Sequence, residues 1–276
     1  MKHKLFLTFI LFYLQLAVAQ NVQELRLTLE KIVPLAADSF YGVDETGTLF
    51  YSTNNVFYKK TSMQTLEFYD ILLGEITSVD LINPMNILLF YKESQMVVFI
   101  DNRLNETQRI NLNELEPYKF IQHASIAGEQ QLWLFNVDEQ RLERYDYGNN
   151  RFLPFLKSVA LPVLTMVSTY NFCHLKTAKQ LLTFNGYGSL TNTIRLEDIE
   201  RVATSFKQLA VLTKTALAIW QQDKDAGFSC THRTEKLPDT LFNGQNTSNS
   251  LYLKGGKLYI YNRNRISVYN TNLLDK

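Results

Sequence analysis

The sequence has little of several features that mark specialised classes of protein. It contains 2 cysteines, 6 prolines and 11 glycines among 276 residues, and its 28 basic and 27 acidic residues nearly cancel. So few cysteines exclude a disulfide-rich scaffold, and modest proline and glycine with 13% aromatic residues exclude a disordered or collagen-like chain. A formal charge of +1 argues against nucleic acid or an anionic membrane as a partner, because both select basic surfaces.

The one long apolar run without charge lies at the N-terminus. Lys2 and Lys4 precede the uncharged segment Leu5–Leu16, and Ala17-Val18-Ala19 then places small residues where signal peptidase cleaves. The run is shorter than the ~20 residues that cross a bilayer, which disfavours the alternative of an uncleaved anchor. The sequence therefore predicts a signal peptide over residues 1–19 and a single domain over 20–276, exported to the periplasm or beyond and not membrane-spanning after cleavage. Cleavage shifts the formal charge to −1 by removing the two lysines.

The remaining chain consists of short apolar runs separated by polar turns. Ile87–Tyr91, Met96–Ile100 and Thr107–Leu112 are rich in β-branched and aromatic residues, and Asn, Asp and Ser clusters bound them, as in consecutive antiparallel strands. The same pattern recurs about every 40 residues, a period typical of β-propeller blades. The second strand of each unit marks the repeat: Thr48–Tyr51, Ile87–Tyr91, Leu132–Phe135, Asn171–Leu175, Leu209–Leu212 and Leu258–Tyr261.

Two further features set the number of blades and the closure of the ring. Each unit has a serine where its innermost strand is expected, and small side chains suit the crowded axis: Ser39, Ser78, Ser125, Ser168, Ser205 and Ser250. The sixth unit reaches only its third strand, Arg265–Tyr269, while the alternating segment Gln23–Glu30 has no unit of its own. We therefore predict an all-β, six-bladed β-propeller with four-stranded antiparallel blades, closed by Gln23–Glu30 as the outer strand of the last blade.

The second unit also carries a resemblance to known proteins. The segment Asn83–Asn105, NPMNILLFYKESQMVVFIDNRLN, resembles a recurring segment of uncharacterised, secreted β-propeller-like proteins of Gram-negative bacteria. The resemblance extends over essentially the whole mature chain and is weakest in the fourth unit, where Phe172-Cys-His-Leu-Lys176 is more polar than the other markers. It implies a propeller of the WD40, NHL or quinoprotein-like kind and a location in the cell envelope, and it brings no catalytic motif.

Candidate metal ligands and nucleophiles are sparse and scattered. Cys173 and Cys230 could form one disulfide or remain two thiols, and the histidines beside them, His174 and His232, fall on different strand positions from each other, which argues against zinc. The alignment of the marker strands predicts a hydrogen-bonded core histidine at position 174, and His123 could face the central channel. We predict no enzyme activity, no metal and no cofactor.

The longer connections between blades are the predicted binding surface, because loops carry function on rigid scaffolds. The candidate partner-binding residues are Tyr118, Val159, Leu161, Val163, Phe242 and Asn243. The alternative is that these residues fold inward and cover the ends of the blades. The sequence thus favours a non-catalytic interaction module of the cell envelope that binds a protein. One alternative is a propeller that binds or cleaves carbohydrate, with Asp38, Asp44 and Asp80 as its acids, and another, by fold analogy alone, is an oxidoreductase.

Overall fold

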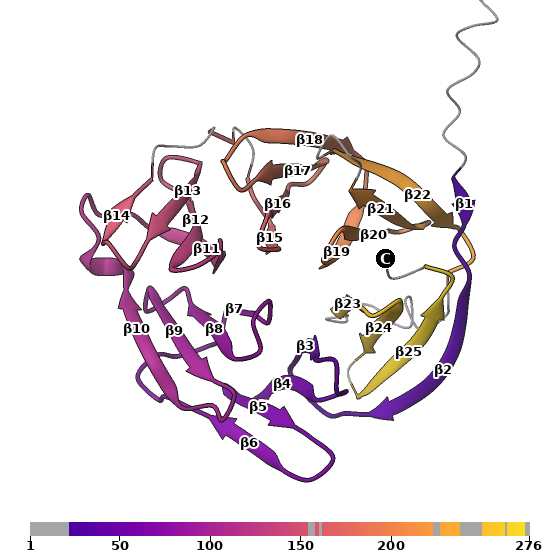
Figure 1. Ribbon diagram of the computed structural model, residues 1–276, viewed down its shortest axis with the longest axis horizontal. Coiled ribbons are helices and arrows are strands. Elements are labelled where there is room, and N and C mark those ends of the chain that lie inside the picture. The colour runs from indigo at the N-terminus through magenta and orange to yellow at the C-terminus, as the bar shows by residue number, and fades with distance from the viewer. Residues whose placement is uncertain are drawn as a thin grey trace, which may run out of the picture.

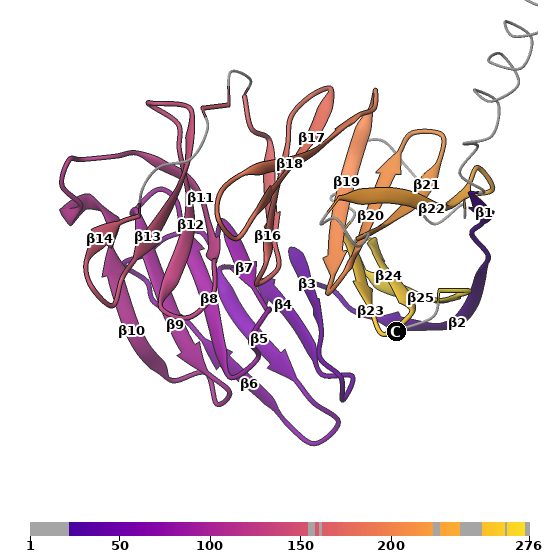
Figure 2. The same ribbon diagram turned by 45° about the horizontal axis from the view of Figure 1, so that its top comes forward.

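Six β-sheets, five of them with four strands and one with five, form a ring around a central axis (Figures 1 and 2). The computed structural model describes residues 22–153, 158–159, 162–222, 227–237, 250–262 and 264–273. Apart from the N-terminal strands, which are the outermost strands of two sheets, the strands of each sheet follow chain order from the axis outward, and this confirms the predicted six-bladed β-propeller. Blade 1 contains β3 (Ser39–Val43), β4 (Leu49–Thr53), β5 (Val56–Lys60) and β6 (Thr65–Phe68). Blade 2 contains β7 (Ser78–Asp80), β8 (Asn86–Tyr91), β9 (Met96–Asp101) and β10 (Glu106–Asn111). Blade 3 contains β11 (Ile121–Ile126), β12 (Gln131–Asn136), β13 (Arg141–Asp146) and β14 (Arg151–Phe152).

The other three blades repeat this order. Blade 4 contains β15 (Thr165–Ser168), β16 (Phe172–Lys176), β17 (Gln180–Asn185) and β18 (Leu190–Arg195), and blade 5 contains β19 (Ile199–Ser205), β20 (Gln208–Thr213), β21 (Leu217–Gln222) and β22 (Phe228–Thr234). Blade 6 contains β23 (Ser250–Lys254), β24 (Lys257–Asn262), β25 (Arg265–Thr271) and the N-terminal strand β2 (Leu27–Pro34). A short 3₁₀ turn, η1 (Leu112–Glu114), follows β10. No helix in the described part of the chain is long and apolar enough to cross a membrane.

The N-terminal segment closes the ring, but it differs from the prediction in two ways: the closing strand has other bounds, and a second short strand precedes it. β2 pairs antiparallel with β25 over Leu27–Pro34, with a bulge between Leu29 and Lys31, instead of over Gln23–Glu30. The preceding strand β1 (Gln23–Glu24) pairs in parallel with β22 and extends blade 5 to five strands. Between the two strands, Leu25 is 2% exposed and its N–H donates to the carbonyl of Arg233 at 2.9 Å. The segment therefore joins blades 5 and 6 in addition to completing blade 6.

Six apolar clusters fill the six spaces between neighbouring blades, which explains why the marker strands are almost continuously apolar. Alternate residues of one strand point to opposite sides of its sheet. In β8, Leu88 and Phe90 pack against blade 3, whereas Ile87, Leu89 and Tyr91 pack against blade 1. Because both sides of a blade are covered by its neighbours, no polar alternation is needed in the inner strands.

The innermost strands meet around the axis, where small residues are needed. All six predicted serines lie on these strands. At Gly42 the backbone φ is +146°, and a Cβ built there would lie 2.6 Å from the ring of Tyr252 on β23. Only glycine fits this conformation and this close approach between blades 6 and 1. The Tyr252 hydroxyl completes the contact by donating to the Val43 carbonyl at 3.2 Å.

Candidate functional site: the connection rim and the polar axis

The four-stranded blades divide the surface loops between two faces of the ring. The turn between strands one and two and the turn between strands three and four open on one side, here called the hairpin face. The turn between strands two and three and the crossover to the next blade open on the opposite side, the connection face. Of the predicted partner-binding residues, Tyr118, Val159 and Val163 belong to connections of this second face.

On the connection face, backbone and side-chain hydrogen bonds link five successive segments across blades 2 to 4. We call these segments the connection rim; they are 69–77, 92–95, 112–120, 137–140 and the described part of 158–164. The Ser94 hydroxyl donates to the Leu73 carbonyl at 3.0 Å, and the Asn113 amide donates to the Ser94 carbonyl at 3.1 Å. Further along, the Phe120 N–H donates to the Asp138 carboxylate at 3.1 Å, and the Val159 N–H donates to the Gln140 carbonyl at 2.7 Å. The rim is therefore one connected surface.

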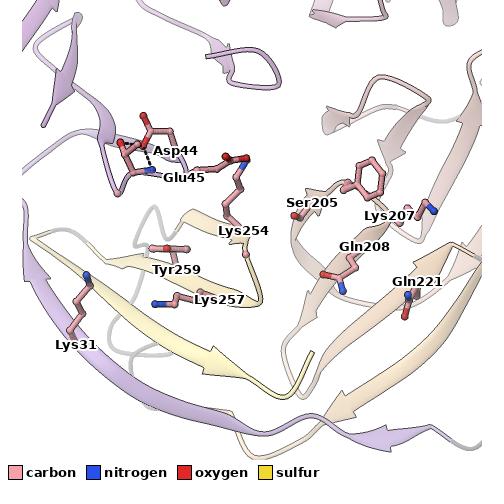
Figure 3. A pocket seen from close by; sticks show the side chains of 14 residues that line it. Lys31, Asp44, Glu45, Ser205, Lys207, Gln208, Gln221, Lys254, Lys257 and Tyr259 are labelled. Carbon is pink, nitrogen blue, oxygen red and sulfur yellow. Dashed lines mark hydrogen bonds and ion pairs between the residues drawn. The ribbon is translucent and has the colours of Figure 1, made fainter. Parts of the chain in front are cut away.

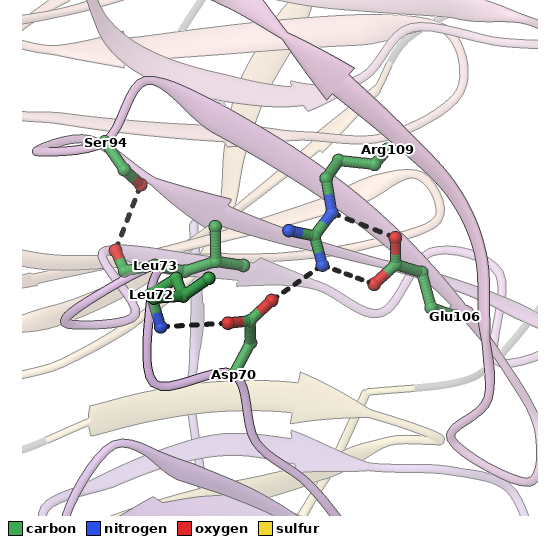
Figure 4. A network of polar contacts seen from close by, with 6 residues as sticks. All are labelled: Asp70, Leu72, Leu73, Ser94, Glu106 and Arg109. Carbon is green, nitrogen blue, oxygen red and sulfur yellow. Dashed lines mark hydrogen bonds and ion pairs between the residues drawn. The ribbon is translucent and has the colours of Figure 1, made fainter.

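The first segment of the rim presents apolar side chains to solvent in a fixed conformation. Ile71 and Leu72 are 76% and 83% exposed, while the following Leu73 is 3% exposed and anchors the loop. Asp70 holds this conformation, because its carboxylate accepts from the Leu72 N–H at 2.9 Å and from Arg109 on β10 at 2.7 Å (Figure 4). These two bonds hold the pKa of Asp70 below its usual value.

Arg109 completes the clamp from the outer strand of blade 2. Its guanidinium binds both carboxylate oxygens of Glu106, at 2.9 and 2.6 Å, in addition to Asp70. Glu106 and Asp70 raise the pKa of Arg109 further above its already high value, so the clamp is charged at any physiological pH. Because the side chains of Ile71 and Leu72 are exposed, they contribute little packing that could order the loop. The loop is ordered instead by the Asp70–Arg109 contact, which Glu106 holds in place.

A buried ion pair anchors the middle of the rim. Lys119 Nζ lies 3.0 Å from Glu143 Oε1 on β13, and both side chains are 8% exposed. The ammonium group also lies 4.8 Å from the ring centroid of Phe152. Nearby, the Gln95 side chain, 2% exposed, exchanges two hydrogen bonds of 2.8 Å with the backbone of Ile121. Blades 2 and 3 are thereby fixed to each other beneath the exposed loops.

The predicted partner-binding residues differ in their exposure to solvent. Tyr118 lies on the rim and is 61% exposed. Val159 and Val163 are 4% and 1% exposed and belong to the apolar cluster between blades 3 and 4, so these two residues follow the alternative in which the connection covers the blade ends. Leu161, Phe242 and Asn243 lie outside the described residues. Residues that the sequence did not single out add to the exposed apolar surface of the rim: Tyr69, Ile71, Leu72, Val137 and Leu164.

At the axis, Asp80 ties the inner strands of three blades together. Its carboxylate accepts from the N–H groups of Ile82 at 2.9 Å and Ile126 on β11 at 2.8 Å, and from the Ser168 hydroxyl on β15 at 3.5 Å. Thr204 on β19 extends the chain by donating to the Ser168 carbonyl at 3.3 Å. Burial raises the pKa of Asp80 to about 6 against the opposing effect of these hydrogen bonds.

The three candidate acids of the carbohydrate alternative have separate surroundings. Asp38 precedes β3 and accepts from the Asn54 N–H at 2.7 Å. Asp44 follows β3 and accepts within its own turn from the Thr46 and Thr48 N–H groups at 2.8 and 3.0 Å. Asp38 and Asp44 flank β3 at its opposite ends, and an extended chain of this length spans up to ~20 Å, whereas roughly 5–9.5 Å separates the two carboxyl groups of a glycosidase.

The histidines and cysteines do not gather. His174 is fully buried, shares a 2.9 Å hydrogen bond with the Thr183 hydroxyl and packs edge-on against Phe228, which confirms the predicted core histidine. His123 is half-buried and lies 3.5 Å from the Val163 carbonyl. Cys173 and Cys230 are both free thiols. In the part of the chain that the structure describes, no three histidine, cysteine or acidic residues are placed to hold a metal ion.

His174 and Asp80, which are both buried and have shifted pKa values, predict how stability depends on pH. Burial lowers the pKa of His174 to about 3. Below about pH 6.5 this histidine is protonated in the unfolded chain but not in the folded one, so the free energy of unfolding falls by about 1.4 kcal/mol for each unit that the pH is lowered. Asp80 acts oppositely: with a folded pKa of about 6 against 3.8 unfolded, its contribution is fully present below pH 3.8 and is lost as pH rises through 6.

We therefore expect the contributions of His174 and Asp80 to the free energy of unfolding to offset each other between about pH 6 and 4, and two variants to separate them. His174→Gln, which can still bond Thr183, should become more stable on acidification across this window. Asp80→Asn should lose stability more steeply than the parent protein. Urea titrations at successive pH values check this, and parallel curves for all three proteins would contradict it.

Comparison with known proteins identifies the fold and no family. No protein-family model and no curated protein matches the chain. Among solved structures, streptogramin B lyase matches with a TM-score of 0.54 and 9% identity over 88% of this chain and 98% of that one. A chain of the mitotic checkpoint complex matches with a TM-score of 0.56 and 10% identity over 94% and 96%. The Swd1 β-propeller domain of Myceliophteria thermophila matches with a TM-score of 0.53 and 10% identity over 89% and 99%. At these identities the likeness extends to the β-propeller fold alone.

Proposed function

We propose that this protein is a non-catalytic interaction scaffold of the cell envelope that binds a protein partner through the connection rim. The observation that carries the proposal is the segment Tyr69–Leu73, in which Ile71 and Leu72 are 76% and 83% exposed while the Asp70–Arg109–Glu106 clamp fixes their backbone. Large exposed apolar side chains on a backbone that is already ordered require less ordering of the loop on binding, which favours association with another protein surface.

The position of the other exposed apolar residues supports the same face. Tyr118 and Val137 lie on adjoining rim segments, because the Val137 N–H donates to the Phe120 carbonyl at 3.1 Å. On the hairpin face, by contrast, exposed residues such as Met63 and Tyr187 stand at single turn tips of separate blades. Isolated apolar residues are common on any protein, whereas a connected group indicates an interface. The expected signal peptide supports the envelope location, and the mitotic checkpoint complex gives a precedent for a propeller within a protein assembly.

Pull-down of the tagged mature protein from native envelope extracts tests this proposal. The rim variant Leu72→Asp/Tyr118→Asp should lose at least tenfold of the recovered partner, because it places two charges in the apolar contact. The matched control Met63→Asp/Tyr187→Asp changes two residues that are 93% and 90% exposed on the hairpin face, and it should recover the partner like the parent protein. Undiminished recovery by the rim variant, or repeated extractions without any partner, would count against the proposal.

A further inference from the structure

A separate cavity opens on the hairpin face, away from the connection rim. It has a volume of about 740 Å³ and lies where the first turns of blades 5, 6 and 1 converge. The β3–β4 turn and the β23–β24 turn form one side, and the β19–β20 turn with the end of β21 forms the other (Figure 3). Its size falls within the roughly 300–1,000 Å³ of pockets that hold small molecules.

The charge of the cavity favours an anion. Four lysines line it: Lys31, Lys207, Lys254 and Lys257. Lys257 pairs with Glu30 at 2.7 Å, and Lys254 lies 3.9 Å from Glu45, whose side chain is 88% exposed.

The other two lysines make no ion pair with any described residue, although Lys31 is near enough to Glu30 to help lower the pKa of that carboxyl. Among the described residues no carboxylate lies within ion-pair distance of Lys31 or Lys207. The remaining lining acid, Asp44, is committed to hydrogen bonds within its own turn. The lining thus carries four ammonium groups against the two carboxylates of Asp44 and Glu45, and this excess of positive charge attracts an anionic group.

The neutral lining groups favour a ligand with hydroxyls. Gln208 lines the cavity and is only 9% exposed, yet no described residue hydrogen-bonds its side-chain amide. Because the amide is open to the cavity, a ligand hydroxyl can both donate to it and accept from it. Gln221 and Ser205 add further donors and acceptors on the same side, while Tyr259 and Phe206 offer aromatic faces.

We propose that this cavity binds a small, hydroxyl-rich anion of the sugar-acid or sugar-phosphate class. The lysines bind the carboxylate or phosphate, Gln208 and Gln221 bind hydroxyls, and an aromatic ring supports the sugar. This site is independent of the connection rim, so a failure of either proposal leaves the other standing. It requires binding alone and no bond cleavage.

Isothermal titration calorimetry of the mature protein at low ionic strength tests the site with four probes: glucuronate, glucose 6-phosphate, glucose and inorganic phosphate. We expect at least one of the two charged sugars to bind at least tenfold more tightly than both glucose and phosphate, and the comparison of the two identifies the preferred anionic group. Binding of neither charged sugar at millimolar concentration would overturn the proposal. Equal affinity for inorganic phosphate would also overturn it, because hydroxyl recognition would then be absent.

Variants locate the binding. Lys31→Gln/Lys207→Gln should weaken binding of the charged sugar at least tenfold, and Gln208→Met should weaken the charged sugar while leaving phosphate unchanged. The control Lys214→Gln alters a lysine of the β20–β21 turn on the connection face, whose side chain is 62% exposed, and should bind like the parent protein. Thermal melts confirm that each variant folds. Unchanged affinity in the folded double lysine variant would place any binding elsewhere and contradict the assignment.

Discussion

Lys119→Met is expected to lower the free energy of unfolding by about 3–5 kcal/mol, as is typical when one partner of a buried ion pair is removed. Lys119 and Glu143 are each 8% exposed, and Glu143 Oε2 already has no hydrogen-bond partner among the described residues. Loss of the ammonium group would leave a carboxylate buried between blades 2 and 3 with no compensating charge. Chemical denaturation monitored by tryptophan fluorescence measures the effect.

Two controls separate the buried charge from the loss of the side chain. The double variant Lys119→Met/Glu143→Met should recover much of the lost stability, because it removes the uncompensated charge together with its partner. Lys214→Met breaks the exposed pair with Asp198, whose side chains are 62% and 60% exposed, and should cost less than about 1 kcal/mol. If Lys119→Met costs no more than Lys214→Met, the pair does not anchor the rim as described.

Leu25→Ala is expected to destabilise the protein by about 2–4 kcal/mol, the usual cost of truncating a buried leucine to alanine. Leu25 is 2% exposed in the cluster between blades 5 and 6, at the point where the N-terminal segment passes from β22 to β25. The matched control is Leu29→Ala, since Leu29 lies four residues further along the same segment and is 48% exposed. It should change stability by no more than about 0.5 kcal/mol.

Urea titrations of the two leucine variants test how the ring is closed. A large loss for Leu25→Ala with a small one for Leu29→Ala supports closure through the β1–β2 junction. Equal losses would mean that both leucines are buried alike, as in a single regular outer strand over Gln23–Glu30, and would contradict the observed division of the segment between two blades.

The sequence predicts the ring better than its ends. Short apolar runs between polar turns locate the second strand of every blade, because that strand is covered on both sides, whereas the innermost strands are marked in the sequence only by their serines. At the N-terminus, Leu25, Leu27 and Leu29 look equivalent in the sequence. Their burial differs because the segment changes neighbours after Glu24 and is shifted by a bulge near Leu29, and neither event leaves a local signal.

The candidate surfaces depend still more on distant contacts. Ile71 and Leu72 lie in a short apolar run that resembles a buried strand, and only the contact of Asp70 with Arg109, 39 residues away, shows why they stay exposed. Val159 and Val163 look like exposed loop residues but fill the space between two blades. The lysines of the hairpin-face cavity come from three strands of blade 6, β2, β23 and β24, and from the β19–β20 turn of blade 5, so no linear motif connects them.

Site-specific photo-crosslinking tests the proposed function most directly. A photoreactive amino acid is placed at Leu72 on the connection rim or at Met63 on the hairpin face, positions that are 83% and 93% exposed, in the protein expressed in its native cells. A rim that docks a protein predicts a discrete adduct from position 72, identified by mass spectrometry, and none from position 63. The same adducts at both positions, or an adduct only at position 63, would contradict it.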